Sequence, residues 1–123
     1  MDGIEELQAL QEILSYLEKL SPNMKVSQAK VLVATAMNPG SKQAVIADKS
    51  GLTMSGMTRA YDVMSSYGRR DKTRDGSDAS NVKMGLLCRE PHPEDRRSWV
   101  MNLTLNGEKA IGRLVEILGA LKN

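Results

Sequence analysis

Residues 84–104 constrain the fold most, because two short apolar runs flank a charged segment that contains Pro91 and Pro93. The runs read MGLLCRE and SWVMNLT, and in the second one large apolar side chains occupy every other position. Proline interrupts helices, and a period of two is typical of a strand with one buried face. The segment therefore predicts a two-stranded hairpin over residues 85–104 with a proline-stiffened tip.

Helical periodicity dominates the rest of the chain. In residues 1–21 large apolar side chains recur every three or four positions, so they form one narrow stripe along a helix that Pro22 ends. The stripe has to be buried, either against the same domain or against a second copy of the chain, and the pattern alone leaves both possibilities open. Its members are Ile4, Leu7, Leu10, Leu14, Leu17 and Leu20.

A nearly all-apolar helix is expected next, in the centre of the core. Ser27 is its expected N-cap, Val31 and Leu32 are among its apolar residues, and the sequence NPG at residues 38–40 stops it. A helix that is apolar on most sides is normally covered by other elements.

Two short helices separated by a glycine-containing turn follow. Ser41 and Thr53 are their expected N-caps. Ala47 is small enough to let the helices cross closely, Gly51 suits the positive φ of the turn, and Met57 can lock the second helix onto the first. The spacing is that of a helix-turn-helix.

Thr104 is the expected N-cap of a final helix over residues 105–123. The order is then a first helix (1–21), a core helix with a helix-turn-helix (27–68), a hairpin (85–104) and a closing helix. This is the order of a single winged helix-turn-helix domain of 123 residues, mostly α with a small β-hairpin wing. The apolar face expected on the last helix consists of Ile111, Leu114, Val115, Leu118 and Leu121.

The charge distribution favours an anionic partner. Residues 1–20 hold five acids and one base, a net charge of −4, so with +2 for the whole chain the remainder carries +6. A basic body beside an acidic first helix suits nucleic acid. The single cysteine excludes an internal disulfide, and no apolar run approaches the length of a membrane span, so we expect a cytoplasmic protein with no membrane partner.

Catalytic and metal chemistry find little support in the sequence. The single histidine, His92, and the single cysteine, Cys88, cannot supply a metal site, or a nucleophile with its base and orienting group. No phosphate-cradling glycine loop is present. We therefore expect no enzyme activity, no metal and no cofactor. With three tyrosines and one tryptophan as aromatic walls, no small-molecule effector is predicted.

Two stretches resemble the winged helix-turn-helix of the MarR family, the multiple-antibiotic-resistance-type regulators. They are IADKSGLTMSGMTRAYDVMSSYG and GLLCREPHPEDRRSWVMNLTLNGEKAI, and the most specific spacing is DRR at residues 95–97, LT at 103–104 and then Gly107. The resemblance extends from about Ser27 to Leu118. It implies a homodimer built from the first and last helices, with recognition helices in successive major grooves and wings in flanking minor grooves.

Residues 69–84 depart from the family pattern as a polar insertion after Gly68, the expected end of the recognition helix. The insertion is interpreted either as a solvated loop or as an additional phosphate-contacting arm that uses Arg69 and Arg70. For dimerisation, the resemblance points to the apolar side chains of the outer helices: Ile4, Leu7, Leu10, Leu14, Leu17, Leu114, Leu118 and Leu121.

Candidate DNA contacts lie in the recognition helix and the wing. Hydroxyls at the helix N-terminus would meet phosphates, Arg59 could read guanine, and Tyr61 could reach a phosphate. Arg96 or Arg97 would enter the minor groove, with Asp95 orienting Arg97; the alternative is a surface pair held by neighbouring acids. The full set is Thr53, Ser55, Gly56, Thr58, Arg59, Tyr61, Arg69, Arg70, His92, Arg96 and Arg97.

The first functional hypothesis is a sequence-specific regulator of transcription that binds double-stranded DNA as a homodimer and acts as a repressor. The alternative is a winged-helix module for protein interaction, or for replication or assembly of a mobile element or phage, with residues 69–84 as its working surface. A small helical dimerising protein without affinity for DNA is the third possibility.

Overall fold

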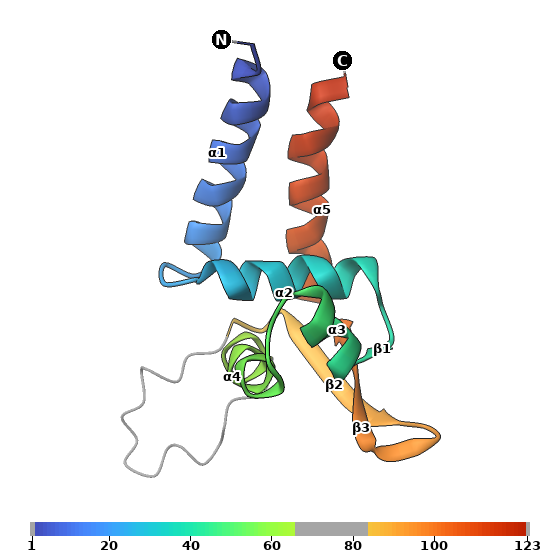
Figure 1. Ribbon diagram of the computed structural model, residues 1–123. Helices are drawn as coiled ribbons and strands as arrows, with labels where there is room; N and C mark the ends of the chain where they lie inside the picture. The colour runs from blue at the N-terminus through green and yellow to red at the C-terminus, as the bar shows by residue number, and fades with distance from the viewer. Residues whose placement is uncertain (1, 66–83, 123) are drawn as a thin grey trace.

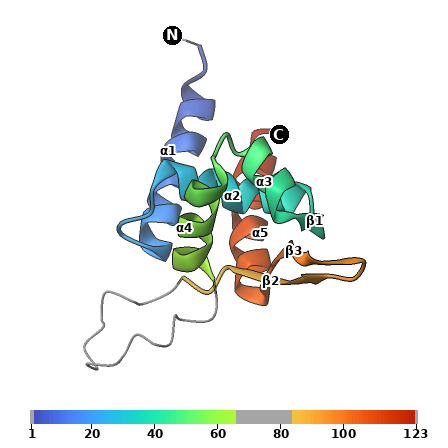
Figure 2. The same ribbon diagram turned by 60° about the horizontal axis from the view of Figure 1, so that its bottom comes forward.

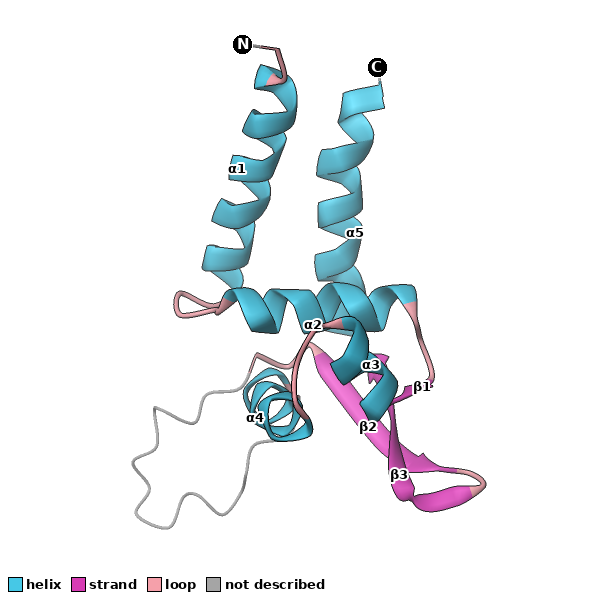
Figure 3. Ribbon diagram, in the orientation of Figure 1, coloured by secondary structure: helices cyan, strands magenta, loops and turns pink. Residues whose placement is uncertain are grey.

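The computed structural model describes residues 2–65 and 84–122 (Figure 1). Helices α1 and α5 lie side by side on one side of α2, and α3, α4 and the hairpin lie on the other. Figure 3 shows helices with one small sheet, which confirms the expected mostly helical fold with a hairpin. The elements are α1 (Ile4–Leu20), α2 (Val26–Met37), β1 (Ser41–Lys42), α3 (Gln43–Lys49), α4 (Met54–Met64), β2 (Leu87–His92), β3 (Asp95–Leu103), α5 (Leu105–Gly119) and the 3-10 helix η3 (Ala120–Lys122).

Helix α2 forms the centre of the core, as its apolar sequence predicts. Val31 and Leu32 are fully buried, and α2 contacts α3, α4, α5 and β3. The expected N-cap was wrong: Lys25 occupies that position and Ser27 lies in the first turn. The reason is a reciprocal contact in which the Lys25 backbone N–H donates to Gln28 Oε1 at 2.9 Å, so the helix begins at Val26.

Helices α3 and α4 form the expected helix-turn-helix. Gly51 adopts φ +70°, a left-handed conformation that glycine takes without strain, and Ala47 and Met57 are buried where the helices meet. The Thr53 hydroxyl accepts a hydrogen bond from the Gly56 N–H at 3.0 Å, which confirms the N-cap of α4. The other expected cap was wrong, because Ser41 pairs with β3 and Lys42 takes the N-cap position of α3.

Helix α4 ends at Met64, earlier than expected. Ser65 is extended, and the Leu86 N–H donates to the Met64 carbonyl at 2.9 Å while the Gly85 N–H donates to that of Ser65 at 3.0 Å. The chain entering the hairpin therefore donates to carbonyls that would accept hydrogen bonds from the next turn if the helix were longer. Gly68 and nearly all of the insertion, residues 69–83, lie outside the described residues.

The sheet is antiparallel with strand order β1-β3-β2. The predicted hairpin is confirmed: Leu87 pairs with Leu103 at its base and Pro91 with Trp99 near its tip, where the register becomes irregular. Strand β1 was not expected, because two residues carry no readable alternation. It pairs with β3 and joins the start of the helix-turn-helix to the hairpin.

Thr104 caps α5 and joins it to the hairpin. Its hydroxyl accepts from the Gly107 N–H at 3.0 Å and donates to the Gly85 carbonyl at 2.6 Å. The buried face of α5 consists of Gly107, Ala110, Leu114 and Ile117. The expected apolar face was right at Leu114 and wrong at Val115 and Leu118, which are exposed.

Gly107 is buried so tightly that a Cβ at this position would overlap the Leu86 carbonyl oxygen. We therefore expect Gly107→Ala to lower the free energy of unfolding by about 1 to 3 kcal/mol, the usual cost of overpacking. Gly112 lies on the same helix with open space around it. The control Gly112→Ala should stabilise the protein by up to about 1 kcal/mol through helix propensity. Urea unfolding measures both, and equal effects would contradict the packing explanation.

Candidate nucleic-acid interface

The first two turns of α4 carry the exposed candidate contacts. Ser55, Thr58 and Arg59 are exposed on this helix, which lies with the hairpin on the side of α2 opposite α1 and α5 (Figure 1). Within the described ranges, no carboxylate forms a salt bridge with Arg59. Thr53 is exposed as well, but its side-chain oxygen already accepts the hydrogen bond from the Gly56 N–H that caps the helix.

Tyr61 does not reach the surface, although the sequence predicted that it could contact a phosphate. Its side chain is only 7% exposed and belongs to the core cluster beside Met57 and Met64. The exposed edge of α4 is one turn earlier, at Thr58 and Arg59, because Tyr61 falls on the inward-facing stripe of the helix.

The wing tip is organised by Asp95 and His92. The Asp95 carboxylate accepts from the Arg97 N–H at 3.2 Å and from the Ser98 hydroxyl at 2.9 Å, and its Oδ2 lies 4.0 Å from Lys42 Nζ. His92 Nδ1 accepts from the Glu94 N–H at 3.0 Å. Asp95 therefore fixes the backbone at Arg97 rather than the guanidinium, and the His92 ring holds the turn.

Arg96 and Arg97 are exposed at the start of β3, directly after the turn. In the part of the chain that the structure describes, neither forms a salt bridge, so the alternative of a surface pair held by Glu94 and Asp95 is not observed. Both guanidinium groups are available to an anion.

Arg89 is a residue that the sequence reasoning missed. Its guanidinium carbon lies 4.3 Å from the ring centre of Tyr61 on α4 and 4.3 Å from that of Trp99 on β3. Its Nη1 donates to Gln43 Oε1 at 2.7 Å. The charge cluster around the prolines concealed it, because nothing in the local sequence shows that a strand arginine meets a tyrosine 28 positions earlier.

Arg69 and Arg70, the candidate contacts of the insertion, lie outside the described residues.

Cys88 is partly buried in β2, and burial, followed by the charge of Glu90, raises the pKa of its thiol. The thiol is therefore protonated at neutral pH, which makes it a poor nucleophile. Residues 2–65 and 84–122 contain no cluster of His, Cys, Asp or Glu suited to a metal ion, and none of their helices is long and apolar enough to cross a membrane.

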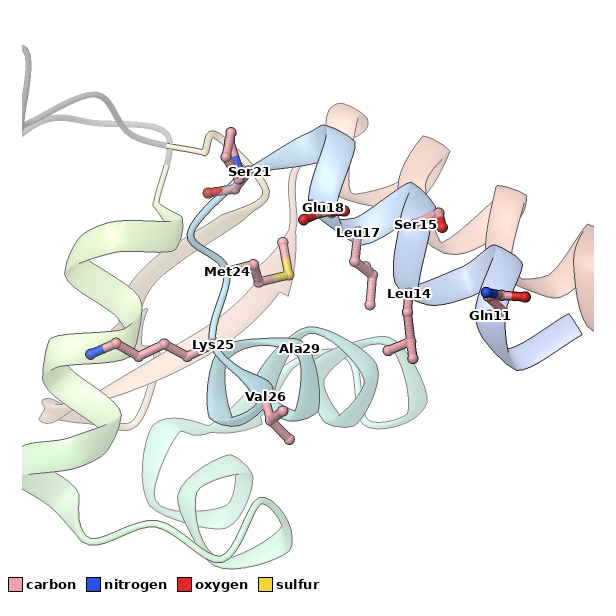
Figure 4. Close-up of a pocket in the computed structure, with 11 residues that line it drawn as sticks. Gln11, Leu14, Ser15, Leu17, Glu18, Ser21, Met24, Lys25, Val26 and Ala29 are labelled. Carbon is pink, nitrogen blue, oxygen red and sulfur yellow. The ribbon is translucent and has the colours of Figure 1, made fainter. Parts of the chain in front are cut away.

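A pocket of about 310 Å³ lies between the end of α1 and the start of α2 (Figure 4). Its wall combines the apolar Leu14, Leu17 and Met24 with the charged Glu18 and Lys25. The pocket is separate from the wing.

Turned so that its lower side comes forward, the molecule shows the hairpin projecting well beyond the helices (Figure 2). The surface suited to a nucleic acid therefore consists of the exposed edge of α4 and this projecting hairpin.

The hydrogen bonds to Asp95 predict an acid-sensitive wing tip. The Ser98 hydroxyl and then the Arg97 N–H lower the pKa of the Asp95 carboxyl, so this stabilisation is present at neutral pH and is lost as the pH falls through the lowered value. Asp95→Ala should lower the protection factor of the Arg97 amide against hydrogen exchange at pH 7, and it should abolish the further fall of that protection factor in acid. The neighbouring Glu94→Ala is the control, and identical exchange in the two variants would contradict the assignment.

No family model and no curated protein matches the sequence. Among solved structures, the S. aureus MepR–DNA complex is 18% identical with a TM-score of 0.67, covering 96% of this chain and 82% of that one.

Two further solved structures show the same arrangement. The transcriptional repressor CouR, bound to a 23-mer DNA duplex, is 23% identical with a TM-score of 0.56, covering 93% of this chain and 67% of that one. MarR is 18% identical with a TM-score of 0.56, covering 93% of this chain and 72% of that one. The chain therefore has the MarR-type winged-helix fold.

Proposed function

We propose that this chain is a transcription regulator that binds double-stranded DNA as a homodimer and represses the genes it controls. One observation carries the proposal: the exposed cations Arg59, Arg96 and Arg97 are presented by α4 and the hairpin on one side of α2, away from the acidic α1. MepR and CouR, which have this fold, were solved with DNA, and CouR is a repressor.

The shapes of the two elements suit the two grooves of B-DNA. The major groove accepts an α-helix, and the first turns of α4 present Ser55, Thr58 and Arg59, whose side chains can reach base edges and phosphates. The hairpin ends in a two-residue turn narrow enough for the minor groove, where the negative potential attracts Arg96 and Arg97. The proposed contacts are therefore a major-groove helix flanked by a minor-groove wing.

Dimerisation is supported by apolar side chains that this chain leaves exposed. Leu7 and Leu10 on α1 are 48% and 50% exposed, and Val115 and Leu118 on α5 are also exposed. Exposed apolar surface of this kind commonly marks an interface between proteins. Leu17 and Leu114, which the sequence placed among the dimer contacts, instead lie in the core of this chain. The proposed interface therefore uses the free ends of the two helices.

DNA binding is tested with the double variant Arg96→Ala/Arg97→Ala on a duplex selected from a random pool. We expect affinity to fall by about 1 to 3 kcal/mol, because the wing loses its cations, and the dependence of affinity on salt to become less steep. The double variant Lys19→Ala/Lys109→Ala is the matched control, since it removes the same charge from exposed positions on α1 and α5. Fluorescence anisotropy measures both. Equal losses would indicate a general charge effect and reject the wing contact.

Dimerisation is tested with Leu7→Glu/Leu10→Glu. Two buried carboxylates at an apolar interface are strongly unfavourable, so we expect sedimentation equilibrium to show a monomer where the wild type is a dimer. DNA affinity should fall as well, because two linked half-sites are no longer bound together. Val26→Glu/Met37→Glu introduces the same charge at exposed apolar positions at the two ends of α2 and should remain a dimer. A wild-type monomer would refute this part of the proposal.

A further inference from the structure

We propose that Arg89 is a positioning residue that holds the wing in a fixed orientation relative to the recognition helix, so that both elements engage one duplex together. The inference rests on the proposed function and adds to it a residue that needs no contact with DNA. Arg89 lies on β2, and its partners Tyr61, Gln43 and Trp99 lie on α4, α3 and β3.

The register of the hairpin explains why Arg89 and Trp99 meet. Arg89 pairs with Met101 and Trp99 with Pro91, so Arg89 and Trp99 are diagonal neighbours on one face of the sheet. Towards the base of the hairpin the same face carries the fully buried Leu87 and Met101. At the base of the hairpin this face packs through apolar side chains, and nearer the tip it packs through the contacts of Arg89 with two aromatic rings.

The contacts of Arg89 depend on its planar guanidinium. The guanidinium carbon lies 4.3 Å from the centre of each of two aromatic rings, and Nη1 donates at the same time to Gln43 Oε1 at 2.7 Å. A lysine ammonium is a compact group that can approach one ring, whereas a planar guanidinium can contact two rings and still donate to an amide oxygen. The contact is therefore specific for arginine and not only for positive charge.

The hydrogen bond to Gln43 extends the link to the recognition helix. Gln43 is 4% exposed, and its Nε2 lies 3.5 Å from the Thr58 hydroxyl oxygen, which is at the long limit of a hydrogen bond. Arg89 thus reaches α4 by two routes, through the Tyr61 ring and through Gln43 to Thr58. Trp99 completes the connection to the strand that carries Arg96 and Arg97.

The charge of Arg89 is not neutralised by a carboxylate in the described ranges. Arg89 could therefore contact a phosphate directly. An experiment has to distinguish this direct contact from the positioning role. A direct phosphate contact requires the charge, and a lysine would retain much of it. A positioning role requires the planar stack, and its loss would remove the benefit of the wing cations.

The test compares the DNA affinity of four proteins: wild type, Arg89→Met, Arg96→Ala/Arg97→Ala and the triple variant. In the wild-type background the wing substitutions should weaken binding about 5- to 150-fold. In the Arg89→Met background we expect them to cause little further loss, because a misplaced wing has already lost its contacts. Equal fold-losses in both backgrounds would show independent sites and overturn the proposal.

A fifth protein, Arg89→Lys, separates positioning from charge. We expect its affinity to match that of Arg89→Met, whereas affinity close to wild type would assign Arg89 to a direct phosphate contact and overturn the proposal. Lys109→Met removes an exposed cation from α5 and is the matched control for the loss of one charge.

A measurement on the free protein checks the stack without DNA. Trp99 is the only tryptophan and is 40% exposed, so quenching by acrylamide reports on the accessibility of this one ring. We expect quenching to increase further in Arg89→Met and Arg89→Lys but not in Lys109→Met. Unchanged quenching would overturn the proposal even if DNA binding fell. A wild-type protein that enriches no duplex, with the quenching change intact, would instead refute the proposed function and the DNA role of Arg89 with it.

Discussion

Helix α2 can be buried on several sides because most of its inward-facing side chains are small or aliphatic and its buried polar side chains bond to nearby backbone groups. Thr35 is fully buried, and its hydroxyl donates to the Val31 carbonyl at 2.8 Å, so it brings no unpaired polar group into the core. Helix α5 above it and the helix-turn-helix below it both pack against this one element, and α1 packs against α5. Because cores resist small changes in volume, a shift of the outer helices relative to α4 has to involve α2.

A second constraint is the junction at Thr104, where the hairpin becomes α5. The Thr104 hydroxyl satisfies the Gly107 N–H and the Gly85 carbonyl, while the Thr104 N–H donates to the Leu86 carbonyl at 3.0 Å. That carbonyl leaves no room for a side chain at residue 107. The Leu-Thr and glycine spacing on which the family resemblance partly depends therefore has a local physical cause: it fixes the angle between the wing and the last helix.

Local signals in the sequence were sufficient for most elements, and they failed where a distant contact decided the outcome. Thr53 and Gly51 act as predicted because capping and positive φ depend on neighbouring residues. Ser41 was misassigned because its pairing with Met101 is long-range. Tyr61 was placed on the DNA surface because its inward direction depends on the packing of α4, and the same packing makes Arg89 its partner. The sequence also predicted the exposed arginines of the wing, because their position depends only on the neighbouring turn.

Described arginines on the two sides of α2 differ in whether a carboxylate pairs with them. Arg113 on α5 binds Glu12 on α1 and Glu116 at 3.0 Å each, so the acidic first helix is partly neutralised by its own neighbour. On the other side of α2, the described carboxylates leave Arg59 and Arg89 without such partners. Unpaired cations repel one another and gain little from the folded state, whereas a polyanion that lies across them removes the repulsion and releases its own counterions. Among the described residues, Arg59, Arg89, Arg96 and Arg97 are therefore cations on this side of α2 whose charge the proposed DNA would neutralise.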